Sequence, residues 1–361
     1  MELSAQPGLG APRAESPRVE PPPPPTNHWY IAAPSAVLGR KPVAATVLGE
    51  PLVMFRDPDG RPVALIDRCL HRNMALSAGR VVAGCIECPY HGWLYDGEGR
   101  CARIPALGEN SPALPRLRSF PATESDGYVW VFVGDRPPTA PPFRFPHLGE
   151  TGWTSFRMRT RFAAAAAACL ENFLDCPHTV FVHRGWFRTR NPRTLCARVR
   201  RYADRVEADF IDEAPGRSVV SALFFPADEP LAHTDRFLMP AVSRVDYRFG
   251  ESRHFIITSS CTPVSADETV VHTVITFRFG RIARLVRVLL EPVCRRIIRQ
   301  DVRVLAQQTA QLRRFGGARF TSVETDLFAR HIDMLWRRAA CGTAPADRDV
   351  PDVDIEVRIR F

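Results

Sequence analysis

The segments Cys69-Leu70-His71-Arg72 and Cys88-Pro89-Tyr90-His91-Gly92-Trp93 bring two cysteines and two histidines close together in the chain. Each segment offers one residue of each kind, spaced C-x-H in the first and C-x-x-H in the second. Thiolates and neutral imidazoles are both common ligands of transition metals in proteins. The two segments therefore predict a metal site made from two mixed Cys–His pairs.

Two kinds of metal site use four such ligands. A structural zinc ion usually takes pairs of one kind, such as C-x-x-C followed by H-x-x-x-H. A Rieske [2Fe–2S] cluster instead takes two thiolates on one iron and two imidazoles on the other. Because each half here is mixed, the pattern favours the Rieske cluster, with Cys69, His71, Cys88 and His91 as its ligands. Cys85, which would complete a C-x-x-C with Cys88, is interpreted as a bystander.

The composition is that of a globular protein with a basic surface. Its 361 residues are enough for two domains, and its formal net charge is +9. A solvated basic surface explains this charge most simply, and docking of an acidic electron-transfer protein or of an anionic membrane is the alternative. No basic run is interleaved with aromatic residues, so nucleic acid is not expected as a partner.

The remaining cysteines are scattered along the chain, unlike those of a secreted disulfide scaffold. The N-terminus has no apolar core of a signal peptide, and no apolar run is long enough to span a bilayer. These features predict a cytoplasmic protein, with a peripheral membrane contact as an open alternative.

The chain divides into four parts. Residues 1–26 are rich in proline and end in a proline run, so we expect a disordered or polyproline tail. Residues 27–136 are typical of short strands and turns, with the two ligand pairs on loops, and form the predicted Rieske domain. Residues 137–150 form a linker that begins rich in proline, and residues 151–361 form a second domain.

The second domain combines antiparallel strands with long helices, which is an α+β arrangement. A strand over Trp153–Phe162 precedes an alanine run that predicts a helix through Phe173. Later helices are expected at 281–313 and Asp326–Ala340. The other strands are expected at 196–201, 206–211, 218–225, 244–248, 254–262 and 269–279.

The stretch Glu171-Asn172-Phe173-Leu174-Asp175-Cys176-Pro177-His178 leads to a second histidine, His183. Such a pair suggests half of a 2-His-1-carboxylate iron site, which leaves positions open for O2 beside a substrate. On an unbroken helix a five-residue spacing would rotate the two side chains apart by about 140°. Pro177 disfavours helical geometry at Cys176, so we expect a break that lets both imidazoles converge. Two ordinary histidines are the simpler interpretation of this motif by itself, but the redox cluster in the same chain argues against it.

The carboxylate of this site is expected from elsewhere, because Asp175 lies too close in sequence to both histidines. Asp301, in a basic stretch with helical spacing, is the first choice, and Asp326 and Glu291 are the alternatives. A single aspartate on a basic helix otherwise indicates an ordinary salt bridge.

At this point the chain resembles a known family, the Rieske-type non-haem iron oxygenases, over about residues 27–340. Its signature C-x-H-R…C-P-Y-H-G-W is met by Cys69–Arg72 and Cys88–Trp93, and N-F-x-D-x-x-H-x-x-x-x-H by Asn172–His183. The sequence is most similar to the branch with pheophorbide a oxygenase and dicamba demethylase. The resemblance implies an all-β Rieske domain followed by a helix-grip catalytic domain. It also implies one Rieske cluster and one mononuclear Fe(II) per subunit.

The same resemblance implies catalytic roles for Asn172 and Asp175. Asp175 would link His91 of one chain to His178 of the next, in a head-to-tail homotrimer. There is also a physical reason for such a carboxylate, because it would orient both imidazoles and raise their basicity. We therefore expect Asp175 to couple reduction of the cluster to opening of the iron site.

Further features fit either a structural or a functional role. The stretch Arg281–Arg299 is amphipathic and basic, as in a helix packed on its own sheet, with an interfacial helix on anionic lipid as the alternative. Arginines between Arg188 and Arg201 indicate a solvated loop or a docking site for an acidic ferredoxin or reductase. The segments Leu223–Pro226 and Phe237–Pro240 line an apolar pocket or belong to the core.

These observations predict a terminal oxygenase, an oxidoreductase of the monooxygenase or dioxygenase kind. Its electrons would come from a separate reductase or ferredoxin, because the chain has no G-x-G-x-x-G nucleotide fingerprint. The expected reaction is hydroxylation or oxidative demethylation of an apolar or aromatic small molecule, with desaturation or ring dihydroxylation as alternatives. A Rieske electron carrier would need only the first domain, and a non-catalytic scaffold would lack one of the ligand sets.

Overall fold

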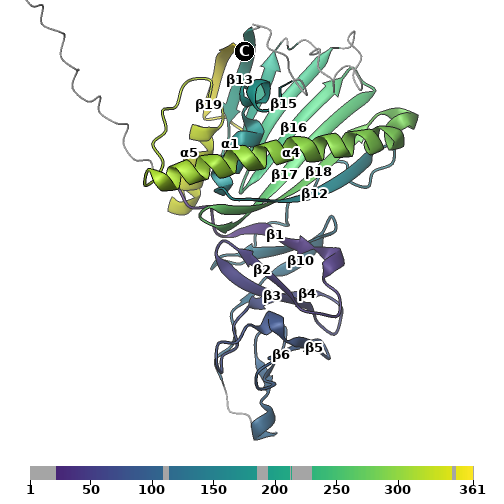
Figure 1. Cartoon of the computed structure of the whole chain (residues 1–361), viewed down its shortest axis with the longest axis vertical. Coiled ribbons are helices and arrows are strands. Elements are labelled where there is room, and N and C mark those ends of the chain that lie inside the picture. Colours follow the sequence, from purple (N-terminus) through teal and green to yellow (C-terminus); the bar gives the residue numbers. More distant parts are fainter. Residues whose placement is uncertain are drawn as a thin grey trace, which may run out of the picture.

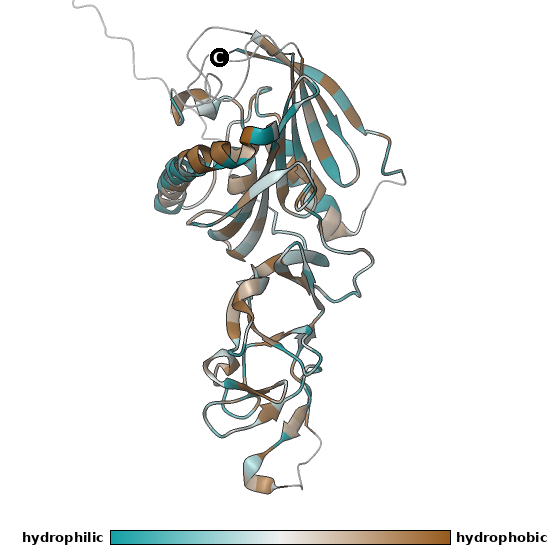
Figure 2. Ribbon diagram, turned by 90° about the vertical axis from the view of Figure 1, so that its right-hand side faces the viewer, coloured by the Kyte–Doolittle hydropathy of each residue, from teal (hydrophilic) through white to brown (hydrophobic). Residues whose placement is uncertain are grey.

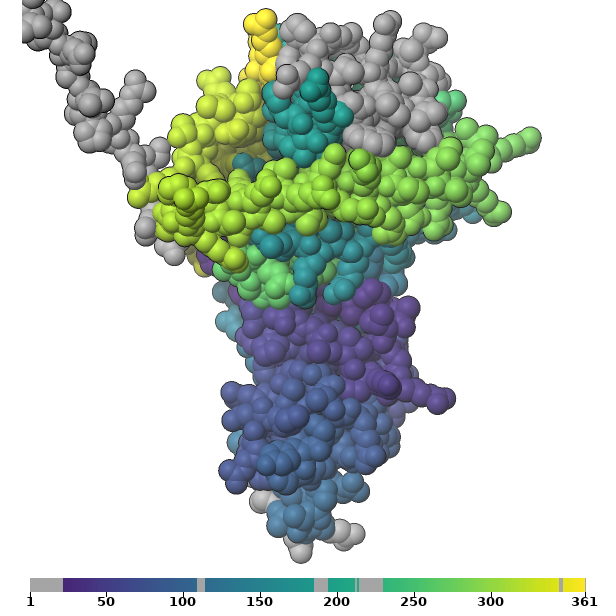
Figure 3. Space-filling view, viewed as in Figure 1, coloured from purple at the N-terminus to yellow at the C-terminus, as the bar shows by residue number. Residues whose placement is uncertain are grey.

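The computed structural model describes residues 22–108, 114–184, 194–211, 213, 230–343 and 347–360. Two lobes follow one another along the long axis of the molecule (Figure 1). The lower and narrower lobe comes from the N-terminal third of the chain, and the wider upper lobe carries the long helix as a band across it (Figure 3). The two pairs of Rieske ligands therefore lie in the lower lobe, and the predicted iron ligands lie in the upper lobe.

Three small antiparallel sheets build the lower lobe. The Cys–His pairs lie on loops that flank strands of the third of these sheets. In spatial order the sheets contain β1 (His28–Pro34), β11 (Tyr128–Val133) and β10 (Ala122–Ser125); β2 (Val43–Val47), β3 (Glu50–Arg56), β4 (Pro62–Ile66) and β9 (Ser119–Phe120); β5 (Arg80–Val82), β6 (Cys85–Glu87), β7 (Leu94–Tyr95) and β8 (Cys101–Arg103).

One antiparallel sheet of eight strands forms the body of the upper lobe. Hydrophobic and hydrophilic residues alternate along its strands (Figure 2), because successive side chains point to opposite faces. In spatial order the strands are β12 (Thr154–Phe162), β18 (Glu268–Arg278), β17 (Arg253–Ser265), β16 (Val242–Phe249), β15 (Leu231–Leu238), β14 (Arg205–Ile211), β13 (Thr194–Arg201) and β19 (Val353–Arg360).

The helices gather on one face of this sheet (Figure 1). They are α1 (Ala166–Leu174), the short α2 (His178–Phe181), α4 (Ala283–Arg314) and α5 (Ala329–Cys341). The 3-10 turns are Ser35–Val37, Leu76–Ala78, Pro105–Leu107 and Gly280–Ile282. Helix α1 contacts β15 to β18 and also α4, so the iron-site residues of α1, α2 and α4 are held between helix and sheet. Within the described part of the chain, no helix is both long and apolar enough to cross a bilayer.

The two lobes share a continuous core. The Thr262 hydroxyl on β17 donates a hydrogen bond of 2.8 Å to the Ile31 carbonyl on β1, and the Leu48 N–H donates to the Pro263 carbonyl at 2.7 Å. The predicted linker also packs against the lower lobe. The Phe145 side chain is buried, and the Phe145 backbone N–H donates a hydrogen bond of 2.8 Å to the Asp126 carboxylate. The lobes are therefore held in one relative position by packing as well as by the chain.

Helix α4 buries only part of the apolar side of the amphipathic stretch Arg281–Arg299. Val286, Leu290 and Ile297 are buried, but Leu285 and Leu289 are more than half exposed. The buried face continues past the predicted stretch to Asp301 and Leu305 at spacings of three or four residues. The reason is that two adjacent apolar strips run along this helix, and the sequence does not say which of them meets the sheet.

The α+β class is confirmed, with an all-β lobe followed by an antiparallel sheet with helices. The helix predicted from the alanine run begins only at Ala166, because Ala165 is extended and the Ala164 carbonyl accepts a hydrogen bond from Thr269. Strands β15 and β19 were not predicted. The strand predicted at 218–225, the segment Leu223–Pro226 and the arginines before Thr194 lie outside the described residues, as does the tail through residue 21.

The end of the predicted tail packs on the lower lobe. The Tyr30 hydroxyl donates a hydrogen bond of 2.6 Å to the Pro25 carbonyl, and Pro22 and Pro25 are buried. The domain boundaries at 27–136, 137–150 and 151–361 stay a prediction.

Candidate metal centres and the adjoining pocket

The Rieske residues sit on two tight loops. In the first loop the Cys69 N–H donates to the Met74 carbonyl at 2.9 Å, and in the second the Cys88 N–H donates to the Trp93 carbonyl at 2.8 Å. Both cysteines are buried, whereas His91 is exposed. The loops thus place two thiols on the inside and the two imidazoles nearer the surface.

The surroundings of these four residues fit a cluster. The His71 and His91 rings lie 4.6 Å apart between centroids, and His71 stacks on Trp93. Nδ1 of His71 is buried with no hydrogen-bond partner, as expected for an atom that should ligate a metal. The Cys69 Sγ lies 3.2 Å from the Tyr95 hydroxyl, whose pKa is raised by burial and by Cys69, so that this group stays a donor. The sequence analysis did not single out Tyr95.

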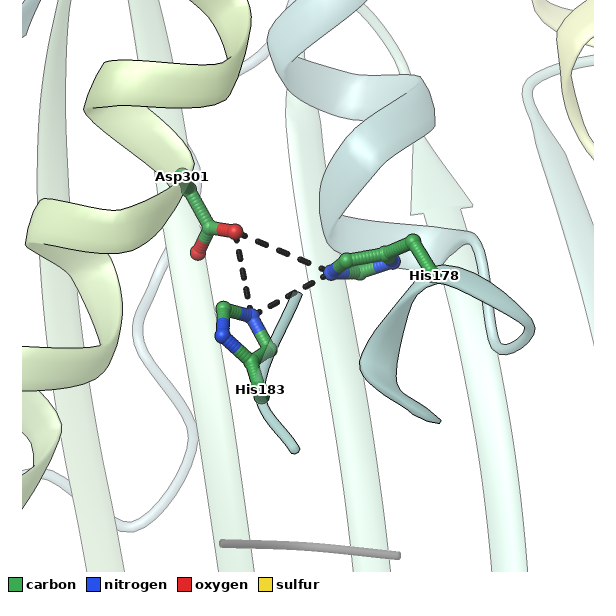
Figure 4. A group of neighbouring side chains, drawn as sticks. All are labelled: His178, His183 and Asp301. Atoms are coloured by element: carbon green, nitrogen blue, oxygen red, sulfur yellow. Dashed lines mark hydrogen bonds and ion pairs between the residues drawn. The ribbon is translucent and has the colours of Figure 1, made fainter. Parts of the chain in front are cut away.

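The second group of residues owes its geometry to a helix break. Helix α1 ends at Leu174 because Asp175 adopts an extended conformation, and α2 begins after Pro177, whose φ of −58° suits a helix start. The break predicted from Pro177 is therefore present, one residue earlier than Cys176. It redirects the chain so that His178 and His183 face each other, with Asp301 of α4 opposite (Figure 4).

The Nε2 atoms of both histidines point to one centre because each Nδ1 is held from behind. His178 Nδ1 donates to the Asp175 carbonyl at 2.5 Å, and His183 Nδ1 donates to the Gln300 side-chain oxygen at 2.8 Å. The two Nε2 atoms are 3.3 Å apart. Asp301 Oδ1 lies 3.0 Å from His183 Nε2 and 3.7 Å from His178 Nε2. Three potential ligand atoms therefore converge on one point.

This arrangement calls for a cation. The three ligand atoms all lie within 4.8 Å of one another, and Asp301 Oδ1 is buried with no hydrogen-bond partner. Burial lowers the pKa of His178, but Asp175 and Asp301 outweigh that effect and raise it, which shows the excess of negative charge around the ring. Two imidazoles and one carboxylate on one side of a metal are the donor set of non-haem Fe(II) sites.

The structure separates the candidate carboxylates. Glu291 forms ion pairs with Arg287 and Arg295 on the exposed side of α4. Asp326 accepts a hydrogen bond from the Val323 N–H. It also lies near Glu171, whose pKa is raised to about 7 by burial and by the charges of Asp175 and Asp326. Only Asp301 of the three candidates joins His178 and His183.

Asn172 and Asp175 both line the pocket that contains the triad. Asn172 Oδ1 is buried without a hydrogen-bond partner, and the Asp175 carboxylate lies 3.6 Å from His178 Nδ1 while its side chain remains about a third exposed. The structure thus brings both residues to the centre, and the link from Asp175 to a neighbouring chain stays a prediction.

The pocket extends from the triad across the inner face of the sheet. Its volume is about 140 Å³, and its far wall includes His233 and Asp235 of β15 and Tyr247 of β16. The sequence analysis missed these residues and Gln300. The position of Gln300 directly before the candidate ligand Asp301 could have pointed to it. His233 and Asp235 gave no such indication, because polar residues at every second position are ordinary in a strand.

Two family comparisons cover most of the chain. Residues 28–121 match the Rieske [2Fe-2S] domain, and residues 162–340 match the vanillate O-demethylase oxygenase C-terminal domain. The chain belongs to the Rieske-type non-haem iron oxygenases. Rieske oxygenases of this kind hold a [2Fe–2S] cluster and a mononuclear iron, and the two groups of residues described above fit these cofactors in chemistry and in geometry.

Individual relatives agree with this membership. The chain is 34% identical over 224 residues to the oxygenase component of dicamba O-demethylase from Stenotrophomonas maltophilia, covering 61% of this chain and 62% of that protein. It is 37% identical over 170 residues to chlorophyllide a oxygenase from Chlamydomonas reinhardtii, covering 44% and 25%. The chain thus spans less than two thirds of the length of these relatives. The crystal structure of dicamba monooxygenase bound to dicamba superposes with a TM-score of 0.74 at 26% identity, covering 87% of this chain and 98% of that one.

Proposed function

We propose that this chain is a terminal oxygenase that inserts oxygen from O2 into an apolar or aromatic small molecule, by hydroxylation or oxidative demethylation. The observation that carries the proposal is the convergence of His178, His183 and Asp301 on one pocket, in a chain that also carries the Rieske ligand set. A mononuclear iron held by these three residues would supply the activation of O2, with electrons from a cluster held by Cys69, His71, Cys88 and His91.

The residues of the chain orient and protect this chemistry. Asp175 and Gln300 fix the two imidazole rings by their Nδ1 atoms, so that three ligand atoms occupy one side and the pocket side stays open. Met158, Ile275 and Ile297 are among the apolar groups that line the pocket and exclude water around a bound substrate.

Partners and assembly are part of the same proposal. A separate reductase or ferredoxin would deliver electrons, since the exposed imidazole of His91 offers the point of access to the cluster. A head-to-tail homotrimer would bring His91 of one chain next to Asp175 of another. The dicamba O-demethylase that this chain resembles is itself named an oxygenase component, which agrees with a separate electron donor. The relatives give no support to a membrane contact through Arg281–Arg299.

Metal analysis and isotope labelling test the proposal. We expect about three irons per chain, two in the cluster and one in the triad, and about two after His183→Ala. The surface variant His147→Ala should keep all three. Host extract incubated with the protein, a surrogate reductase and isotope-labelled O2 should yield a labelled product that His183→Ala abolishes. Two irons in the unaltered protein would indicate an electron carrier instead, and the same labelled product from His183→Ala would contradict the proposed site.

A further inference from the structure

The far wall of the pocket has a polar group that the iron chemistry does not use. Strand β15 turns His233 and Asp235 toward the pocket, because residues two apart on a strand share a face. Both residues are almost fully buried. The rest of this sheet face is lined with small or apolar side chains such as Val245, Ile257 and Ser259. A buried ionisable pair in such a wall needs an explanation beyond core formation.

Both nitrogens of His233 are engaged by carboxylates. Nδ1 lies 2.6 Å from Glu213 and Nε2 lies 2.9 Å from Asp235. Carboxylates accept hydrogen bonds, so each nitrogen must carry a proton, and the ring is an imidazolium. Cross-strand neighbours hold it in place, since the ring stacks on Phe210 at 4.2 Å and on Tyr247 at 4.3 Å between centroids. His233 is therefore an internal counter-ion with no N–H left for a ligand.

The cluster presents a carboxylate to the pocket. Of the two carboxylates that share the imidazolium, Asp235 is the one that lines the pocket, and the shared ring offsets its charge only in part. Among the described residues that line the pocket there is no lysine or arginine to offset it. A carboxylate has about four lone-pair sites, and the contact to His233 uses one of those on Asp235. What the wall offers a ligand is thus a hydrogen-bond acceptor with negative charge.

The size of the pocket sets a second limit. Its volume of about 140 Å³ is close to that of a cavity of about 150 Å³ that holds one benzene ring in another protein. The triad and Asp235 line the same cavity, so a single-ring ligand would lie between them.

We propose that this pocket selects a ring-sized substrate whose polar end is an N–H donor, cationic or neutral, and that Asp235 receives that end while the opposite end lies at the triad. A substrate whose polar end is a carboxylate would be disfavoured, because it would place a second anion against the cluster with no proton between them. Asp235 is then the residue that determines specificity. The inference rests on the proposed function, but its test does not require turnover.

Three isosteric probes test the inference on the iron-loaded full chain. Benzamidine is a cation with N–H donors, benzamide is neutral with N–H donors, and benzoate is an anion with acceptors only. We expect the dissociation constant of benzamidine, measured by calorimetry, to be about tenfold or more below that of benzoate, with that of benzamide between them. In Asp235→Asn, which removes the charge and keeps the shape, the ratio of benzamidine to benzoate affinity should fall close to one.

Asp246→Asn is the matched control. Asp246 is a buried aspartate on the neighbouring strand that pairs with Arg236 and Arg244 instead of lining the pocket, so its removal should leave the ratio unchanged. Benzoate binding as tightly as benzamidine in the unaltered protein would overturn the inference, even if Asp235→Asn does not fold. A ratio that persists in a folded Asp235→Asn variant would also overturn it. Failure of the proposed function would appear elsewhere, as two irons per chain or no labelled product, and the probe affinities would still be measurable.

Discussion

Single residues behind the ligands decide how the iron site is shaped. Each histidine of the triad turns its Nε2 inward only because its Nδ1 has an acceptor behind it, the Asp175 carbonyl for His178 and the Gln300 side chain for His183. Such partners fix the tautomer and the ring orientation of a metal-binding histidine. Gln300 does this from α4, the same helix that supplies Asp301, so one helix positions two of the three ligands.

Replacing Gln300 by leucine should weaken iron binding. The His183 ring would lose its acceptor and rotate, so we expect the affinity for Fe(II) to fall by about 10–100-fold. Titration of the iron-depleted protein with Fe(II), with a chelator as competitor, measures this. Gln307→Leu, on the exposed side of the same helix, is the control and should bind iron as the unaltered protein does. Equal affinities in both variants would show that Gln300 does not position His183.

The Tyr95 hydroxyl should tune the cluster. Its hydrogen bond to Cys69 Sγ stabilises the extra negative charge of the reduced state, so Tyr95→Phe should lower the reduction potential by roughly a few tens of millivolts. A redox titration followed by EPR gives the value. Tyr90→Phe removes a hydroxyl from an exposed ring between Cys88 and His91 and should leave the potential unchanged. An unchanged potential in Tyr95→Phe would mean that the hydroxyl does not donate to the sulfur.

At the scale of elements, strand register builds the pocket wall. Residues His233 and Tyr247 are directly paired across β15 and β16, and Phe210 on β14 pairs with His233 from the other side. Because side chains alternate between faces, the pairing of these three strands is enough to stack the His233 ring between Phe210 and Tyr247 on the face that carries the pocket. A shift of one residue in the register of β15 would move His233 and Asp235 to the opposite face.

This stack should make stability depend on pH. Burial lowers the pKa of His233, but Asp235 and Glu213 outweigh it and raise the pKa to about 9. The folded state therefore binds the proton more tightly than the unfolded state, so the stabilisation is complete below pH 6.5 and is lost as the pH rises through 9. The shift corresponds to roughly 3 kcal/mol.

A comparison of variants isolates this effect. In urea unfolding, His233→Gln should cost several times more stability at pH 6 than at pH 9.5. Val245→Ala, an apolar change in the same wall, should cost the same at both values. If the cost of His233→Gln did not change between them, the ring would not be held as an imidazolium.

At the scale of the whole molecule, the two candidate metal sites lie in different lobes. The Rieske loops flank β5 and β6 in the lower lobe, and the triad lies beside α4 in the upper lobe (Figure 1). The shared core between β1 and β17 holds the lobes in this relation. In the proposed head-to-tail trimer, electrons would pass from the cluster of one chain to the triad of its neighbour.

Mixed oligomers distinguish these routes. Cys88→Ala removes the cluster and His183→Ala removes the iron site, so neither variant should form labelled product by itself. Co-expressed in equal amounts they should regain about a quarter of the unaltered activity, because half of the donors and half of the acceptors remain intact in a cyclic assembly. No recovery in oligomers shown by mass spectrometry to be mixed would indicate transfer within one chain.

The sequence determined the ligand chemistry and the class of the fold. Cys69, His71, Cys88 and His91 are recognisable because a cluster on loops needs its ligands at short spacing, and Pro177 marks the break that His178 and His183 require. Asp301 was chosen from residues distant in sequence, and only the approach of α4 to α1 and α2 separates it from Glu291 and Asp326. Local spacing holds this information because neighbours in the chain stay neighbours in space.

Only the tertiary structure decided what surrounds these ligands. Gln300, Tyr95 and His233 act through partners that are 20 to 117 residues away in the sequence, and such pairs leave no periodic signal. The choice between the two apolar strips of α4 was also made by the sheet that the helix meets. Sequence fixes which groups are available for chemistry, but long-range packing fixes which of them share a pocket, and that is where the selectivity of this protein is expected to lie.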